Sequence, residues 1–283
     1  MFEKLRYAFV VSRFRFWIYT GGTFVIGYTF GAENISDFYS FEYYIYLFYF
    51  FFLANVFIYG VNDLFDLSTD EENPKKYKKE HKLMKEKIKD LKSILYFTFG
   101  ISIILLMLQD SWLERSIFFT FLFLAYFYSA GPLRFKSKPI LDFSSNMLYV
   151  MPGIFAYALV LSEFPPISIV LAGFFHISAM HIFSAVPDIE YDKKAGIRTT
   201  PVTLGKKPSL LLCFVFWSLL ALLTVYLTGL HPLSFLVLIY PIIPLLVLTY
   251  DKAEIEKVYW YLPYVNTSLG GLLFVSLLLE TVL

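Results

Sequence analysis

The chain has 283 residues, of which 58% are hydrophobic, 20% aromatic and only 17% charged, and its formal net charge is +1. Soluble domains carry about 25% charged and about 45–50% apolar residues, and the core of one would not need 32 Phe and 22 Tyr. The composition therefore excludes a soluble enzyme and a nucleic-acid-binding protein. It predicts an all-α, polytopic membrane protein that forms a single domain over residues 1–283.

Nine apolar segments, separated by Gly, Pro or charged residues, are the expected transmembrane helices. Several are shorter than the roughly 20 residues that span a bilayer as a helix. Because backbone groups in lipid need internal partners, short or interrupted spans indicate kinked helices around a polar interior. In chain order the segments cover residues 16–30, 43–61, 93–108, 117–129, 140–161, 167–186, 209–228, 233–250 and 258–279.

The positive charges of the chain predict its orientation. If the N-terminus lies in the cytoplasm and the nine helices alternate, every Lys and Arg except Arg115 falls on the cytoplasmic side. Cytoplasmic loops of membrane proteins carry such an excess of Lys and Arg. We therefore expect a cytoplasmic N-terminus, with the two longest polar loops, 63–92 and 188–207, on the cytoplasmic face of the cell membrane.

Two short features carry little information on function. No apolar run with a small-residue cleavage site follows the basic residues at positions 4–15, so we do not expect a cleaved signal peptide. The single cysteine, Cys213, lies in an apolar run and is expected to be an inert buried thiol.

The first polar loop opens with a group of oxygen-bearing side chains. If the preceding helix continues through them, its 100° advance per residue places Asn62, Asp63, Asp66 and Asp70 within about 100° of one another on one face. The second loop opens with Asp188 and Asp192, again one turn apart. Either motif alone would be read as an ordinary solvated helix end. Two on the same expected side indicate a shared site.

Several carboxylates that converge at one place repel one another unless cations neutralise them. Mg²⁺ binds few carboxylates and takes its remaining ligands from water and substrate phosphates, and no His and Cys cluster indicates a softer metal. We therefore expect Mg²⁺ and a phosphate or diphosphate between the two motifs.

Basic residues near the motifs could bind that phosphate group. Arginine offers paired donors to phosphate and lysine a point charge. The candidates are Arg134 and Lys136 after the fourth helix, Arg13 before the first, and Arg198 after the second motif. Each of them could equally be an anchor on the positive side of the membrane.

Three polar residues at membrane depth are candidates for the cavity that binds a second substrate, since such residues are usually functional. Asp142 and Asn146 are one turn apart at the start of the fifth helix, and His181 lies seven residues before Asp188. Helix-start electrostatics could explain Asp142, and an ordinary core histidine could explain His181.

The two aspartate motifs resemble those of the UbiA superfamily of intramembrane prenyltransferases. The matching residues are Asn62-Asp63-x-x-Asp66-x-x-x-Asp70 and Asp188-x-x-x-Asp192-x-x-x-Gly196, with Tyr128-Ser129, Pro132, Arg134 and Lys136 between them. Gly131 stands where relatives usually have a second proline. The resemblance implies a helical bundle around a central cavity that opens to lipid, in which Mg²⁺ and the aspartates bind a prenyl diphosphate and help it to ionise.

Within that superfamily the chain looks most similar to the lycopene elongases, which build C50 carotenoids. The stretches that carry this likeness are Ser12–Trp17, Lys138–Asn146 and Met180–Thr200. It implies a dimethylallyl diphosphate donor and a linear, lycopene-like acceptor. Menaquinone-type relatives share the Asp-Ile-Glu-x-Asp core, so an aromatic or quinone acceptor anchored by Asp142, Asn146 or His181 stays open.

The resulting hypothesis is Mg²⁺-dependent prenyl transfer inside the bilayer. Each group of residues has an expected role. Asp66, Asp70, Asp188 and Asp192 would be catalytic and would bind metal with Asn62 and, in support, Asp63, while Arg13, Tyr128, Arg134, Lys136 and Arg198 would bind the diphosphate. A transporter would place its acids near mid-bilayer, and a non-catalytic lipid-binding protein would need no Mg²⁺.

Overall fold

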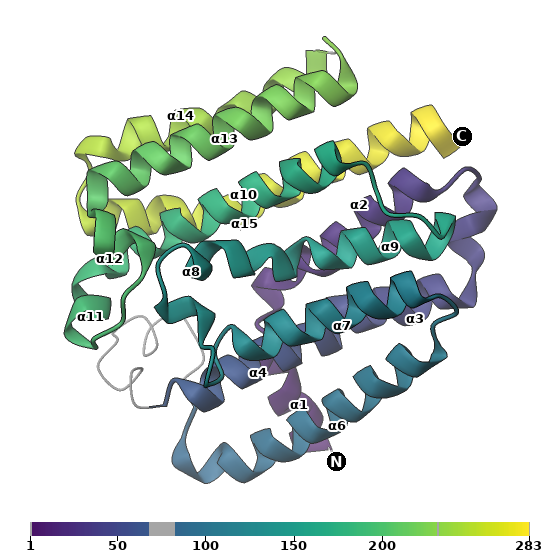
Figure 1. Cartoon of the computed structure of the whole chain (residues 1–283), viewed down its shortest axis with the longest axis horizontal. Helices are drawn as coiled ribbons and strands as arrows, with labels where there is room; N and C mark the ends of the chain where they lie inside the picture. The colour runs from purple at the N-terminus through teal and green to yellow at the C-terminus, as the bar shows by residue number, and fades with distance from the viewer. Residues whose placement is uncertain (1, 68–82, 231, 283) are drawn as a thin grey trace. The chain divides into compact units, whose positions relative to one another are not determined.

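The computed structural model describes residues 2–67, 83–230 and 232–282, and every regular element in these ranges is a helix (Figure 1). Contacts between residues group the chain into two compact units. Unit 1 comprises Met1–Leu133, Met151–Phe164 and Gly270–Leu283, and unit 2 comprises Arg134–Val150 and Pro165–Leu269.

The helices of unit 1 contain the first aspartate motif. They are α1 (Phe2–Val11), α2 (Gly21–Gly31), α3 (Phe41–Phe48), α4 (Ala54–Phe65), α6 (Ile88–Leu108), α7 (Trp112–Phe127) and α9 (Met151–Leu161), with the short turns η1 (Phe14–Tyr19), η2 (Ile35–Tyr39), η3 (Tyr49–Leu53), η5 (Lys85–Lys87) and η11 (Leu278–Val282). Figure 1 shows α6 and α7 side by side, with α7 also next to α9.

A very close approach of two backbones joins α2 to α9. A Cβ atom on Gly27 would lie 2.0 Å from the carbonyl oxygen of Gly153, and one on Gly153 would lie 2.8 Å from the carbonyl oxygen of Thr23. Only glycine fits at such a crossing, which is typical of membrane helices that associate through small residues.

Aromatic side chains fill the interior of unit 1. Phe50 is fully buried and lies 5.4 Å, between ring centroids, from both Phe24 and Phe121. Phe118 and Phe155 are also buried, with centroids 5.4 Å apart. These distances fall in the favourable range for ring pairs. Part of the high aromatic content therefore serves packing.

The helix that leads to the first motif is interrupted in its middle by a π-helical turn. α3, η3 and α4 form one continuous helix from Phe41 to Phe65, with the π turn at Tyr49–Leu53. Thr20 donates to the carbonyl of Phe50 at 2.6 Å, and Asn55 Nδ2 donates to the carbonyls of Phe50 and Phe51. A π turn changes the helical hydrogen-bond pattern, and these two polar side chains bind the carbonyls there.

Unit 2 contains the second motif and the longest apolar helices. Its elements are η6 (Phe135–Ser137), α8 (Leu141–Ser144), η7 (Ser145–Tyr149), α10 (Ile167–Ala185), η8 (Val186–Asp188), α11 (Ile189–Lys194), α12 (Thr200–Leu204), α13 (Lys206–Thr228), η9 (Pro232–Leu238), α14 (Ile239–Leu246), η10 (Val247–Thr249) and α15 (Lys252–Leu277), of which α15 continues into unit 1 from Gly270.

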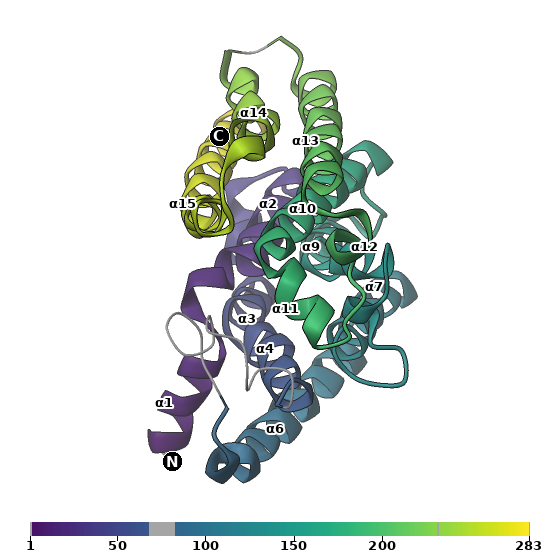
Figure 2. The ribbon, with the colours of Figure 1, turned by 90° about the vertical axis from the view of Figure 1, so that its left-hand side faces the viewer.

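The core of unit 2 forms where α13 packs between α10 and α14 (Figure 2). Trp217 is fully buried there, with its ring 5.8 Å from those of Phe183 and Tyr240. Cys213 lies on the same helix, is fully buried and donates its S–H to the carbonyl of Ala179 at 3.4 Å. The expectation of a buried thiol is confirmed.

Each of the nine apolar segments contains helix, although their ends differ from the expected ones. Seven helical runs of the described residues are long and apolar enough to cross a membrane: Phe41–Phe65, Ile88–Leu108, Leu141–Leu161, Ile167–Lys194, Lys206–Thr228, Pro232–Thr249 and Lys252–Glu280. The other two segments contain α2, with 11 residues, and α7, with 16. Nine complete crossings therefore remain a prediction.

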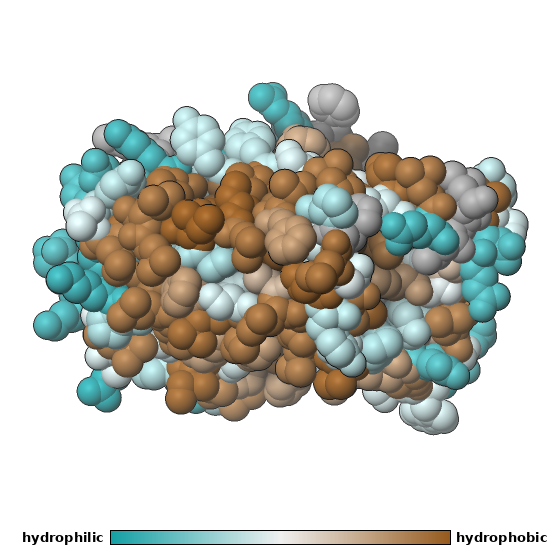
Figure 3. Space-filling model, turned by 90° about the horizontal axis from the view of Figure 1, so that it is seen from above, coloured by the Kyte–Doolittle hydropathy of each residue, from teal (hydrophilic) through white to brown (hydrophobic). Residues whose placement is uncertain are grey.

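Apolar side chains also cover the outer surface of unit 2. Leu222 and Tyr226 of α13 are 68% and 78% exposed, and Leu246 of α14 is 62% exposed. Figure 3 shows apolar residues over these helices. Exposed apolar surface of this extent is unfavourable in water but suits a lipid environment.

Candidate active site

The first motif lies where α4 ends. The helix stops at Phe65, and Asp66 is its C-cap residue. Asn62 Nδ2 donates to Asp66 Oδ2 at 2.9 Å and to Ser129 Oγ at 3.0 Å. Asn62 and Asp66 therefore lie on the same face, as expected. They do so although α4 ends at Phe65 and does not continue through the motif.

These two bonds orient the side chain of Asn62. Both use the amide nitrogen, so the carbonyl oxygen Oδ1 is the atom that Asn62 can offer to a cation. Asp66 is 6% exposed and offers carboxylate oxygens beside it. Oxygen ligands of this kind suit Mg²⁺.

Asp63 has a different partner. It is 1% exposed and forms an ion pair with Arg13, Nη2 to Oδ1, at 2.7 Å. Arg13 has a left-handed backbone with φ of 51°, and its guanidinium lies 4.7 Å from the ring centroid of Tyr59. Arg13 was expected to bind phosphate and Asp63 to support the metal site. In the structure they form an ion pair with each other within unit 1, although they are 50 residues apart in sequence.

A tyrosine of α1 lies in the field of the same carboxylate. Burial, with the negative charges of Asp63 and Asp90, raises the pKa of Tyr7 to about 12. Since an ordinary tyrosine titrates near 10, this phenol keeps its proton at neutral pH and does not add a further negative charge beside Asp63.

The second motif is held by unit 2 at the end of α10. Asp188 closes the turn η8 and is the N-cap residue of α11, and Asp192 lies one turn further along that helix. Thr199 Oγ1 lies 3.5 Å from Asp192 Oδ2, and the backbone N–H of Ile197 donates to the carbonyl of Asp192. Gly196 turns the chain back with φ of 69°, a conformation that favours glycine.

Asp142 is tied to the residue that follows this loop. Its carboxylate accepts from the backbone N–H of Thr200 at 2.6 Å and from the hydroxyl of Thr200 at 2.5 Å, and its side chain is 0% exposed. His181 Nε2 lies 4.0 Å from Asp142 Oδ2. Asn146, which is 4% exposed, donates to the main-chain carbonyl of Asp142.

Thr200 is a residue that sequence reasoning missed. It ends the family-like stretch Met180–Thr200, and nothing in its spacing indicates a contact with Asp142. The available signal was a residue with a hydroxyl and a backbone N–H at the start of α12, two residues after the exposed Arg198.

The basic candidates are divided between the units. Lys136 lies in η6 of unit 2, and Arg134 is the residue just before it. Both side chains are half-buried, and Arg134 has a left-handed backbone with φ of 38°. Arg198 is exposed in unit 2, whereas Tyr128 belongs to unit 1 as the C-cap residue of α7.

Among the described residues, no group of three or more His, Cys, Asp or Glu could hold a metal ion by itself. Unit 1 contains Asn62 and Asp66, and unit 2 contains Asp188 and Asp192. Asp70 lies outside the described residues. The donor set consists of carboxylate and amide oxygens, and its chemistry fits Mg²⁺.

Comparison with known proteins decides the family. The model of the UbiA prenyltransferase family matches residues 20–269. The chain belongs to this family. It is therefore an intramembrane prenyltransferase, and the resemblance expected from the aspartate motifs is confirmed.

Two relatives of similar length match almost the whole chain. The lycopene elongase/hydratase of Haloferax volcanii is 37% identical over 96% of this chain and 88% of its own length. That of Halobacterium salinarum is 37% identical over 94% of both chains.

Solved UbiA structures share the fold. A UbiA homolog from Archaeoglobus fulgidus, bound to GPP and Mg²⁺, is 20% identical with a TM-score of 0.71, over 95% of this chain and 99% of that one. The same homolog bound to DMAPP and Mg²⁺ gives a TM-score of 0.69 at 21% identity, over 95% and 99% of the two chains.

Proposed function

We propose that the protein transfers a five-carbon prenyl group from dimethylallyl diphosphate to the end of a linear carotenoid such as lycopene, with Mg²⁺, within the cell membrane. The observation that carries the acceptor is the 37% identity, over almost the whole chain, to two lycopene elongase/hydratases. We choose dimethylallyl diphosphate as the donor because its prenyl group has the five carbons by which such an acceptor would be extended.

We assign the metal ligands to both aspartate motifs. Asn62 Oδ1 and the carboxylates of Asp66, Asp70, Asp188 and Asp192 would hold Mg²⁺ against the diphosphate. Asp63 supports the first motif from its ion pair with Arg13. When bound, Mg²⁺ neutralises negative charge on the departing diphosphate.

Basic and phenolic side chains would complete the diphosphate site. Arg134, Lys136, Arg198 and Tyr128 are the donors, and Arg13 contributes its positive charge next to the first motif. Their value lies in stabilising charge that develops as the allylic C–O bond breaks, because preorganised donors act most strongly on such charge.

The bond changes follow from these groups. The C–O bond of the donor breaks and its electron pair leaves with the diphosphate. The terminal double bond of the acceptor attacks the allylic carbon, and the new C–C bond leaves a tertiary carbocation on the acceptor. This cation then loses a proton to give an alkene or binds water and releases a proton to give an alcohol. The word hydratase in the names of both relatives fits the second course.

The hydrogen bonds of unit 2 favour a carotenoid over an aromatic acceptor. A quinone precursor would need polar anchors for its ring substituents, and Asp142, Asn146 and His181 were the candidates. The carboxylate of Asp142 is already bound to Thr200, and the amide of Asn146 to the backbone. An apolar polyene needs neither group.

The orientation completes the proposal. The distribution of Lys and Arg supports a cytoplasmic position for the N-terminus and both motif loops, where a water-soluble diphosphate donor would reach them.

The test uses the purified full chain with Mg²⁺, dimethylallyl diphosphate and lycopene. We expect products heavier by one or two five-carbon units, and none with an Asp188→Asn control of similar size. If lycopene is unchanged while 4-hydroxybenzoate is prenylated under the same conditions, the carotenoid assignment is wrong and the aromatic one replaces it.

A further inference from the structure

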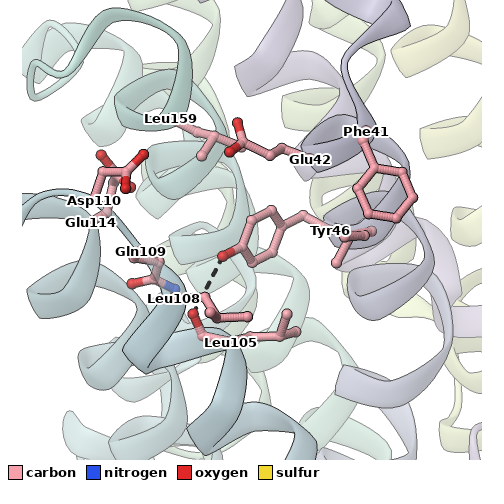
Figure 4. Close-up of a pocket in the computed structure, with 10 residues that line it drawn as sticks. Phe41, Glu42, Tyr46, Leu105, Leu108, Gln109, Asp110, Glu114 and Leu159 are labelled. Atoms are coloured by element: carbon pink, nitrogen blue, oxygen red, sulfur yellow. Dashed lines mark hydrogen bonds between the residues drawn. The ribbon is translucent and has the colours of Figure 1, made fainter.

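A pocket in unit 1 lies away from the first aspartate motif. Its volume is about 300 Å³, and it is lined by α3, the turn between α6 and α7, and α9 (Figure 4). Tyr46 is on its wall, on the same continuous helix as Asn62. Sixteen residues at 1.5 Å each separate the two by about 24 Å along that helix. The pocket is therefore remote from the expected chemistry.

Gln109 gives this pocket a polar centre. It is 3% exposed, and neither its Nε2 nor its Oε1 makes a hydrogen bond of good geometry among the described residues, although the Tyr46 hydroxyl lies near enough to interact with it. The hydroxyl of Tyr46, which donates to the carbonyl of Leu105 at 3.4 Å, is directed toward the same turn in Figure 4. A buried amide without well-placed hydrogen-bond partners is unfavourable, and a ligand that binds both of its polar atoms would relieve this cost.

The other side chains limit what that ligand can be. The walls are apolar, with Ile45, Leu105 and Leu159 among them. Glu42 and Asp110 are exposed at the rim, and their negative charges disfavour a phosphate or another anion. An amide that offers one donor and one acceptor group complements a neutral hydroxyl, which can both accept and donate.

Glu114, also on the wall, is already accounted for. Ser111 Oγ donates to its carboxylate at 2.6 Å and accepts from its backbone N–H, the reciprocal cap that starts α7. Its carboxylate is therefore committed to the helix start and not to a cation in the pocket.

Size and access fit the end of a long molecule. A volume of about 300 Å³ is at the lower limit of ligand pockets and, at about 30 Å³ per water-sized group, holds about ten non-hydrogen atoms. That is two five-carbon units. Phe41 and Leu108 at the mouth are 79% and 69% exposed, so a chain that lies along the outside of the helices can place its end inside.

We propose that this pocket binds the hydroxylated end of a linear isoprenoid, with Gln109 as its hydrogen-bond partner. The inference rests on the proposed function. A carotenoid extended and hydrated at one end carries a hydroxyl there when its second end reacts, and the pocket would hold the finished end while the other is at the aspartates. It thus favours the once-modified product as the next acceptor.

The test compares two acceptors in the purified full chain. One is lycopene, and the other is its C45 mono-alcohol, with kcat/KM measured for each. Gln109→Leu removes both polar atoms and leaves a slightly shorter, apolar side chain. We expect it to lower the ratio of kcat/KM for the mono-alcohol to that for lycopene about tenfold. Ser116→Ala, on the exposed face of α7, is the matched control and should keep the wild-type ratio.

An unchanged ratio in a folded Gln109→Leu protein would overturn the proposal, as would equal loss of both activities. If neither acceptor reacts in the wild-type protein, the proposed function fails, and the pocket is then judged by equilibrium binding of tritiated geraniol, a ten-carbon alcohol. Binding weakened about tenfold by Gln109→Leu and unchanged by Ser116→Ala would support the pocket. Equal binding by all three proteins would refute it.

Discussion

The buried carboxylate of Asp142 binds Thr200 twice, through its backbone N–H at 2.6 Å and its hydroxyl at 2.5 Å. Thr199, the neighbour of Thr200, caps α12 and lies 3.5 Å from Asp192. The start of the fifth apolar segment is thereby joined to the loop that carries the second motif. We interpret Asp142 as a positioning residue for Asp192, since the two threonines connect it to that side chain.

The first prediction concerns this tie. Asp142→Asn replaces an acceptor oxygen by an NH₂ group facing the N–H or the hydroxyl of Thr200. Leaving a buried donor without a partner should destabilise the protein by about 1–3 kcal/mol. We expect a lower melting temperature and a higher Mg²⁺ concentration for half-maximal activity. Thr200→Ser, which keeps both donors, should stay near wild type. A wild-type Mg²⁺ dependence in Asp142→Asn would show that the tie does not position the motif.

The second prediction tests the metal ligands. Asp66→Ala or Asp188→Ala should abolish prenyl transfer and leave a folded protein in the membrane, because removing one carboxylate relieves repulsion within an acidic site. Activity is measured as product formed at saturating Mg²⁺, and folding by thermal denaturation. More than about a tenth of the wild-type rate corresponds to a loss of less than about 1.4 kcal/mol in the barrier and would contradict the assignment.

The third prediction addresses the ion pair between Arg13 and Asp63. The two side chains are 11% and 1% exposed, so the removal of one takes the opposite charge away from a buried ion. Arg13→Met should therefore destabilise the protein by about 3–5 kcal/mol. The double variant with Asp63→Asn should recover part of this loss, which a double-mutant cycle of unfolding free energies measures. Additive effects of the two substitutions would mean that the pair does not couple.

The fourth prediction concerns topology. Single cysteines at Lys89 and Lys207 in a Cys213→Ala background should react with a membrane-impermeant maleimide only from the cytoplasm, and cysteines at Glu33 and Glu163 only from the other side. All four positions are exposed, so access depends on the membrane and not on burial. Labelling of positions 89 and 207 from opposite faces would separate the two aspartate motifs and exclude a shared site.

Sequence periodicity predicted the features that depend on one helix alone. The contact of Asn62 with Asp66 follows from their spacing of one turn, and the burial of Cys213 from the apolar run around it. Partners distant in sequence could not be predicted, because a helical pattern indicates which face is polar but not what that face meets. Arg13 and Asp63 are 50 residues apart, and Asp142 and Thr200 are 58.

The π turn within 41–65 could not be predicted from the sequence either, because one of the side chains that bind it is distant in sequence. Its carbonyls are bound by Thr20, from another helix, as well as by Asn55. A sequence read for its 3.6-residue period shows an uninterrupted apolar helix there. The polar residues that bind the altered backbone are recognisable only once the two helices are seen to pack.

The last prediction concerns the packing of α2 on α9. A methyl group on Gly27 would overlap the backbone of Gly153, with its Cβ 2.0 Å from the carbonyl oxygen, and backbone cannot rotate away as a side chain can. Gly27→Ala should therefore cost about 1–3 kcal/mol or more through overpacking and lower the melting temperature. Gly100→Ala is the matched control, since a Cβ there has no atom within 4 Å and alanine favours a helix by about 1 kcal/mol over glycine. Gly100→Ala should keep or raise the melting temperature. Equal stability of the two variants would show that α2 and α9 can move apart without cost, and the close crossing would then not hold unit 1 together.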